Sequence, residues 1–116
     1  VLDNIKYGAN VSSNEIKRFI ELYKITIFNK LSNGLNTSVG IGGKQLSGGQ
    51  RQVVLIIKAF IKKKKFYILD EPTTGLDFKT KKLIMNIIRK LSVDKTVIII
   101  SHDNDIKEIL DEIIYF

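Results

Sequence analysis

The sequence contains no cysteine, which excludes disulfide bonds and thiolate-ligated metal sites and suits a reducing, cytosolic compartment. It also lacks any apolar run near the roughly 20 residues that a membrane-spanning helix needs. The longest apolar blocks are short ones such as 53–57 and 97–100. Residues 1–7 lack the basic, apolar and small-residue order of a signal peptide. Any membrane passage is therefore expected in sequence outside these 116 residues.

Two familiar nucleotide-binding loops are missing as well. The stretch most similar to a G-x-x-x-x-G-K-[ST] phosphate loop, residues 38–45, has Ser38 in place of the first glycine and Gln45 after Lys44. The dinucleotide pattern G-x-G-x-x-G begins at Gly40 but has Gln45 where its third glycine belongs. The chain therefore carries no complete phosphate-binding loop of either kind.

The composition is that of a globular domain with a basic excess. Hydrophobic residues make up 44% of the chain, enough for one packed core. Nineteen Lys and Arg against 12 Asp and Glu give a formal net charge of +7. A basic balance is compatible with nucleic acid, an acidic membrane surface or an anionic substrate such as a nucleoside triphosphate. Charge alone does not choose among these partners.

Two capping boxes predict helices in the first half of the chain. Ser12 with Glu15 predicts a helix of about three turns starting near residue 13. A loop rich in Ser, Asn and Gly follows over 32–43. Ser47 with Gln50 then predicts a second helix, from about Gly48 to Lys62.

The second half alternates apolar runs with helical patterns. Residues 66–70 are typical of a buried strand that Pro72 terminates, and 96–101 of a second strand. Between them, apolar residues at helical spacing follow a possible Asp77 cap. A short acidic helix and a strand over 113–116 are expected at the end. This alternation predicts an α/β domain with parallel strands, preceded by a mostly helical part.

The segment 46–52 combines features of an anion site. It reads Leu-Ser-Gly-Gly-Gln-Arg-Gln, so that two glycines and a hydroxyl lie at a helix N-terminus. Such a terminus exposes unpaired N–H groups, and glycine lets a phosphate approach them. We expect Gly49 to be exposed in the monomer. Taken alone, however, a Ser-Gly-Gly cap is also an ordinary structural feature.

Acidic and histidine side chains stand at the predicted carboxyl ends of both strands. Asp70 ends the first strand, Glu71 follows it, and His102, the single histidine, follows the second. Ligands of open parallel sheets bind at this edge. Asp70 is therefore a candidate Mg²⁺ residue, and Glu71 a candidate general base for an attacking water. A pair of solvated turn acids and a structural histidine are the alternative interpretations.

These motifs together resemble those of ATP-binding cassette (ABC) ATPases. LSGGQRQ at 46–52, FYILDEPTTGLD at 66–77 and SHD at 101–103 resemble the signature motif, the Walker B motif with its D-loop, and the switch histidine. The opening VLDNIKYG resembles the stretch after the Q-loop of exporter-type cassettes. The resemblance implies a P-loop NTPase-like partial parallel sheet flanked by helices and preceded by a helical signature subdomain. Residues 1–62 would form that subdomain and 63–116 the Walker B part of one incomplete domain.

The resemblance also implies roles for single residues, with ATP and Mg²⁺ as cofactors. Glu71 would be the catalytic base, His102 the γ-phosphate sensor and Asp70 the Mg²⁺ residue. The cofactor-binding residues would be Ser47, Gly48, Gly49 and Gln50, facing ATP across a dimer interface, and Asp77 in the D-loop.

The implied partners are a second nucleotide-binding domain that supplies Walker A and transmembrane domains in the same or another chain. No nucleic acid is expected, and the domain would lie at a membrane on its cytoplasmic side. Because the Walker A lysine, the adenine-stacking aromatic and the Q-loop glutamine would precede Val1, we expect the isolated chain to be inactive as an ATPase.

Two departures from the family pattern leave other functions open. Residues 53–59 read VVLIIKA where the family usually has a further arginine and an Ile-Ala-Arg-Ala run, and 39–41 lack the exporters' Val-Gly-Glu glutamate. A soluble cassette ATPase that acts on DNA or ribosomes, which the basic charge mildly favours, is one alternative. A non-catalytic remnant is the other. The lysine run 62–65 has no interleaved aromatics and indicates a solvated turn.

Overall fold

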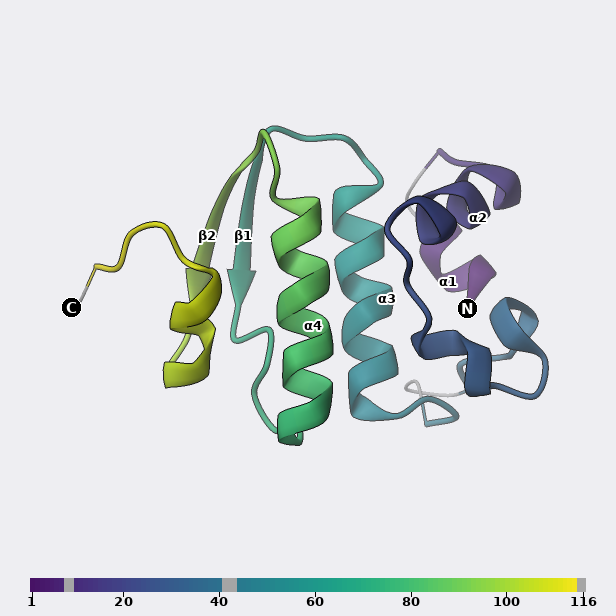
Figure 1. The fold of residues 1–116 in the computed structure, drawn as a ribbon. Helices are drawn as coiled ribbons and strands as arrows, with labels where there is room; N and C mark the ends of the chain where they lie inside the picture. The colour runs from purple at the N-terminus through teal and green to yellow at the C-terminus, as the bar shows by residue number, and fades with distance from the viewer. Residues whose placement is uncertain (8–9, 41–43, 115–116) are drawn as a thin grey trace. The chain divides into compact units, whose positions relative to one another are not determined.

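The computed structural model describes residues 1–7, 10–40 and 44–114 (Figure 1). The chain divides into two compact units, Val1–Lys64 and Lys65–Phe116. Within the described residues, no helix has both the length and the apolar character of a membrane-spanning helix.

The regular elements described in the first unit are all helices. Its elements are α1 (Leu2–Lys6), α2 (Ser13–Leu22), the 3-10 helices η1 (Ile27–Lys30) and η2 (Gly34–Asn36), and α3 (Gly48–Phe60). Both predicted helices are present, and α3 ends two residues before the predicted Lys62. The short α1 was not predicted, because no side chain caps its start.

The predicted capping box opens α2. The Ser12 hydroxyl accepts a 3.2 Å hydrogen bond from the Glu15 N–H, and Glu15 accepts one of 2.6 Å from the Ser12 N–H. These bonds satisfy N–H groups that a helix start otherwise leaves without partners. Ile16 and Ile20, four residues apart on one helical face, are buried. These two residues of α2 are therefore part of the core.

The second unit combines two strands with helices, which confirms the predicted α/β class. Its elements are β1 (Phe66–Asp70), α4 (Phe78–Leu91), β2 (Thr96–Ile100) and the 3-10 helix η4 (Asn104–Ile109). The strands are parallel, in a register that runs from Phe66 opposite Thr96 to Asp70 opposite Ile100. The expected acidic helix is thus the 3-10 helix η4, which contacts α4.

The predicted terminal strand over 113–116 is wrong at its two described residues. Ile113 and Ile114 have no regular structure, and positions 115–116 lie outside the described residues. A strand needs a neighbour with which to form hydrogen bonds. Among the described residues, the sheet contains only β1 and β2.

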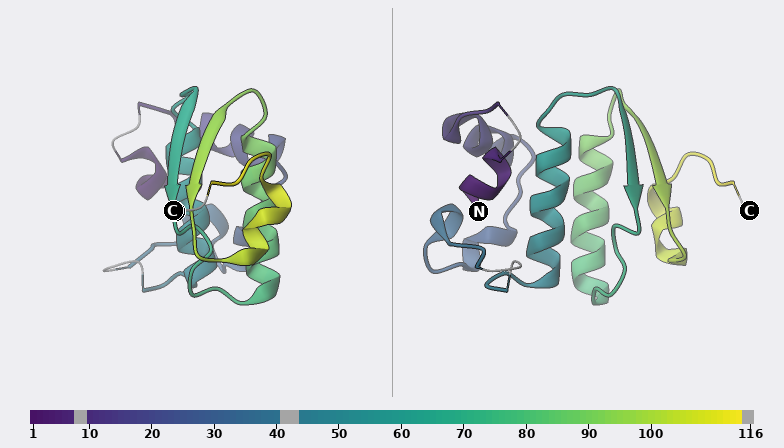
Figure 2. Two further views of the ribbon diagram at one scale, coloured as in Figure 1. Left: turned by 90° about the vertical axis from the view of Figure 1, so that its left-hand side faces the viewer. Right: turned by 180° about the vertical axis from the view of Figure 1, so that it is seen from behind.

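The two faces of the sheet differ in exposure. Tyr67 on β1 is buried. Helix α4 runs alongside the two strands (Figure 2). The opposite face carries exposed apolar side chains, because side chains alternate along a strand. These are Phe66, Ile68, Ile98 and Ile100. Both strands end at the same edge, which positions the segments that follow Asp70 and Ile100 next to each other.

Candidate functional site

The Ser47–Gln50 turn is built as a capping box at the start of α3. The Ser47 hydroxyl accepts a 3.1 Å hydrogen bond from the Gln50 N–H, and the Gln50 side chain accepts one of 2.9 Å from the Ser47 N–H. The side-chain nitrogen Nε2 of Gln50 also donates a hydrogen bond to the Ile27 carbonyl, at 3.4 Å. The N–H groups of Gly48 and Gly49 remain as first-turn donors without an intrahelical acceptor. They are the groups that an anion can use.

The two glycines of this turn differ in exposure, and the expectation that Gly49 is exposed was wrong. Gly48 is exposed, whereas Gly49 is buried. Gly49 lies four residues before Val53, which is fully buried, so both lie on the inward face of α3. Of the two, Gly48 therefore offers the open approach to the helix N-terminus.

The acidic pair lies where β1 ends. Asp70 is the last residue of the strand and is exposed. Glu71 follows with φ +49°, a left-handed conformation that is uncommon for a residue with a side chain. Its N–H donates a 2.7 Å hydrogen bond to the Ile100 carbonyl at the end of β2. The turn of the chain at Glu71 is therefore tied to the neighbouring strand.

Glu71 and His102 lie together, as parallel neighbouring strands predict. Nε2 of His102 is 3.6 Å from Oε1 of Glu71. The other Glu71 oxygen, Oε2, accepts a 2.7 Å hydrogen bond from the Thr74 hydroxyl. The His102 side chain is 99% exposed and that of Glu71 28%. Both groups can thus meet a ligand that arrives at this edge of the sheet.

Asp77 caps α4, as its position predicts. Its carboxylate accepts hydrogen bonds from the Thr80 N–H at 3.2 Å and the Thr80 hydroxyl at 2.5 Å. These two bonds, the hydroxyl first, lower the pKa of Asp77 below its ordinary value. The carboxylate is exposed and stays charged at neutral pH.

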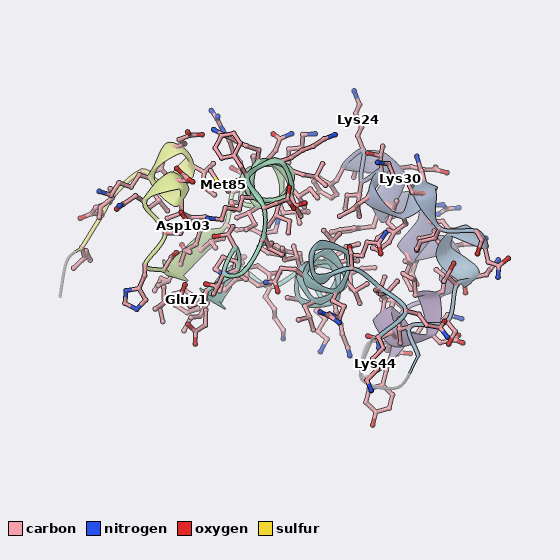
Figure 3. All side chains as sticks on the ribbon, turned by 90° about the horizontal axis from the view of Figure 1, so that it is seen from below. Lys24, Lys30, Lys44, Glu71, Met85 and Asp103 are labelled. Atoms are coloured by element: carbon pink, nitrogen blue, oxygen red, sulfur yellow. The ribbon has the colours of Figure 1, made fainter. Side chains whose placement is uncertain are left out.

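Asp103 follows His102 directly, and no role of its own was predicted for it from the sequence. Its Oδ2 accepts a 3.1 Å hydrogen bond from the Thr73 hydroxyl and lies 2.6 Å from Nζ of Lys81. The hydrogen bond from Lys81, and after it the one from the Asp105 N–H, lower the pKa of Asp103 below its ordinary value. Figure 3, a view onto the carboxyl ends of the strands, labels Glu71 and Asp103 on the segments that follow them. Because these contacts join distant parts of the chain, no local pattern predicts them.

The residues present fit Mg²⁺ and a phosphate group. No cluster of three or more His, Asp or Glu side chains suited to a metal lies within 1–7, 10–40 and 44–114. Mg²⁺ needs no such cage, since it is commonly held by one or two carboxylates together with phosphates and water. The exposed Asp70 matches that mode. The Ser47–Gln50 turn belongs to the first unit, and Asp70, Glu71 and His102 to the second.

Comparison with known proteins accounts for this set of motifs. A family model described as ABC transporter matches residues 2–74, more than half of the chain. The chain belongs to the ABC transporter family. The match covers the Ser47–Gln50 turn, Asp70 and Glu71, whereas Asp77 and His102 lie beyond it.

Relatives of this ABC transporter chain are named as a flippase and as an ABC transporter B family member. It is 38% identical to the ATP-dependent lipid A-core flippase of Vibrio vulnificus over 98% of its own length and 20% of the flippase. It is 37% identical to the flippase of the same name from Aliivibrio fischeri over the same shares. It is 35% identical to ABC transporter B family member 21 of Arabidopsis thaliana, over 88% of this chain and 8% of that protein. The chain thus spans about a fifth of the length of the flippases.

Proposed function

We propose that this chain is the signature and Walker B part of an ATP-hydrolysing domain that drives an exporter-type membrane transporter. The observation that carries the proposal is the 3.6 Å approach of His102 to Glu71 beside Asp70, at the edge where parallel strands present their ligands. The exporter-type assignment rests on the relatives, which are named as a flippase and an ABC transporter B family member. None of these names supports action on DNA or ribosomes.

In the proposed reaction, Glu71 orients and deprotonates the water that attacks the terminal phosphate of ATP. Its carboxylate is partly exposed, and Thr74 and His102 lie on either side of it. The exposed His102 contacts the terminal phosphate. Asp70 would help to hold Mg²⁺, which would supply positive charge beside the phosphates. Glu71 thus accepts a proton from the attacking water, whereas His102 and Asp70 position the phosphate group and its metal ion.

The proposed function requires two partners. The 116 residues contain no G-x-x-x-x-G-K-[ST] loop, so the triphosphate must be held by sequence outside them. The N–H groups of Gly48 and Gly49 with the Ser47–Gln50 turn contact ATP bound to a second nucleotide-binding domain, and Asp77 lies near that interface. Transmembrane domains, in the same or another polypeptide, respond to the ATP-driven movement of the nucleotide-binding domains at the cytoplasmic face of a membrane. The isolated 116-residue chain is expected to be inactive.

Glu71→Gln in the full-length transporter tests the proposal. The amide keeps the size of the side chain but cannot accept the proton, so single-turnover hydrolysis should fall by roughly 10²- to 10⁴-fold. ATP binding should persist, and a nucleotide-dependent closed dimer should accumulate in size-exclusion chromatography with ATP and Mg²⁺. Glu108→Gln, the same change at an exposed carboxylate on η4, is the control and should hydrolyse ATP normally. Near-normal hydrolysis by Glu71→Gln would remove Glu71 as the base.

A further inference from the structure

Asp103 connects three segments of the second unit. The Thr73 hydroxyl donates to it from the loop after β1, and Lys81 pairs with it from near the start of α4. Its second oxygen, Oδ1, accepts a 3.1 Å hydrogen bond from the Asp105 N–H and so caps η4. The loop after β1, α4 and η4 are therefore held by one carboxylate.

This connection is largely shielded from water. Thr73 is fully buried, and the side chains of Asp103 and Lys81 are only 13% and 23% exposed. A buried hydroxyl needs a hydrogen-bonding partner, because leaving it unpaired is costly. The Thr73 hydroxyl has that partner in Asp103, so the loop after β1 and the segment after β2 cannot separate without that cost.

His102 depends on its chain neighbours for its position. Its side chain is 99% exposed, so packing does not hold it. The residue after it, Asp103, is bonded to Thr73, and Thr73 is the second residue after Glu71. The bond from the Glu71 N–H to the Ile100 carbonyl fixes the same two segments on the strand side. Two hydrogen bonds, one at the strand ends and one between Thr73 and Asp103, thus join the segments that carry Glu71 and His102.

We propose that Asp103 is a positioning residue for ATP hydrolysis, which holds the backbone of His102 in place beside Glu71 by bonding Thr73 and Lys81. The proposal rests on the proposed function, in which Glu71 and His102 act on ATP. Asp103 itself need not touch the nucleotide. Its loss should lower kcat and leave the binding of ATP nearly unchanged.

The protein contains a matched control for this proposal. Lys82, the residue after Lys81, pairs with Glu108, so this second ion pair also connects α4 with η4. Its side chains are 41% and 57% exposed, and exposed pairs contribute little to stability. Within the described residues, this pair makes no bond to Thr73 or to the loop after β1. A role in merely attaching η4 to α4 would be shared by both pairs, whereas positioning of His102 belongs to Asp103 alone.

The first experiment compares Lys81→Met with Lys82→Met in the full-length transporter. We expect Lys81→Met to lower kcat between about 10- and 100-fold, the effect of a small misplacement of reacting groups. Its KM for ATP should stay within about two-fold of the wild-type value, and amide hydrogen exchange over residues 101–106 should accelerate. Lys82→Met should leave kcat and this exchange unchanged. Equal effects of the two variants on kcat, or unchanged exchange in Lys81→Met, would overturn the proposal.

A second comparison tests the bond to the other loop. Thr73→Val keeps the shape of the side chain but removes the donor, and Thr73→Ser keeps the donor. We expect a loss of kcat in Thr73→Val that Thr73→Ser rescues, with Asp103→Asn reducing kcat at least as much. Equal kcat values for the two Thr73 variants would contradict a role for this bond. Glu71→Gln measured in parallel separates the two ideas: if it hydrolyses ATP normally, the proposed base is wrong, while the exchange data still decide whether Asp103 holds the turn.

Discussion

The Thr74 hydroxyl donates a 2.7 Å hydrogen bond to one carboxylate oxygen of Glu71, and it does so from a turn only three residues away. The Thr74 N–H also approaches the Glu71 carbonyl, at 3.4 Å. The turn that reverses the chain after β1 therefore also orients the proposed base. The other Glu71 oxygen is left facing His102.

Thr74→Val should slow hydrolysis by about 10-fold in kcat, because a hydrogen bond to a charged group contributes about 1.5–3 kcal/mol. Without the hydroxyl, the Glu71 carboxylate can rotate away from the attacking water. Steady-state ATPase assays of the full-length transporter measure the effect. Thr74→Ser keeps the donor and should retain most activity. Equal activity of Thr74→Val and wild type would mean that this bond does not orient the base.

The two capping boxes allow a matched test of the signature turn. Ser12→Ala and Ser47→Ala remove the same kind of bond from α2 and α3, and each should destabilise its helix start by about 1 kcal/mol. Hydrogen exchange of the first turn of each helix measures this loss. Only Ser47→Ala should also raise KM for ATP, because only that turn is proposed to meet the phosphate. An increase of similar size in Ser12→Ala would reduce the effect to general stability.

Gly48 is the better position at which to test phosphate approach, since it is exposed and Gly49 is buried. Gly48→Ala adds only a methyl group, whereas Gly48→Asp adds a negative charge next to the proposed phosphate. We expect the order wild type, Gly48→Ala, Gly48→Asp in decreasing ATPase activity, with similar circular dichroism for all three. Full activity of Gly48→Asp would show that no phosphate comes near this helix start.

The lowered pKa of Asp77 predicts how the start of α4 responds to acid. A carboxyl that binds its proton more weakly in the folded state stabilises that state above its unfolded pKa of about 3.9, and loses this effect as the pH falls through the lower folded pKa. Asp77→Asn keeps a cap without the charge. Protection of the first turn of α4 against hydrogen exchange should therefore be greater in wild type at neutral pH, and the difference should vanish in acid. Asp111→Asn, at an exposed carboxylate outside α4, is the control, and its protection of α4 should equal that of wild type at every pH.

The sequence by itself determined the local features of this protein. Ser12, Ser47 and Asp77 cap helices as predicted, because each bond spans three residues and needs no distant partner. The apolar runs and the helix between them predicted parallel strands, and hence that Glu71 and His102 meet at one edge. The motifs likewise indicated the family to which the chain belongs.

Only the tertiary structure decided which side chains support that edge. Thr73 and Asp103 are 30 residues apart in sequence, so their bond exists only once both loops are in place. The burial of Gly49 depends on the inward direction of one face of α3, and a glycine carries no side chain to reveal it. Ile113 and Ile114 have the composition of a strand but no regular structure. A residue's own chemistry suffices for contacts within one helical turn, whereas contacts across the fold depend on where the rest of the chain lies.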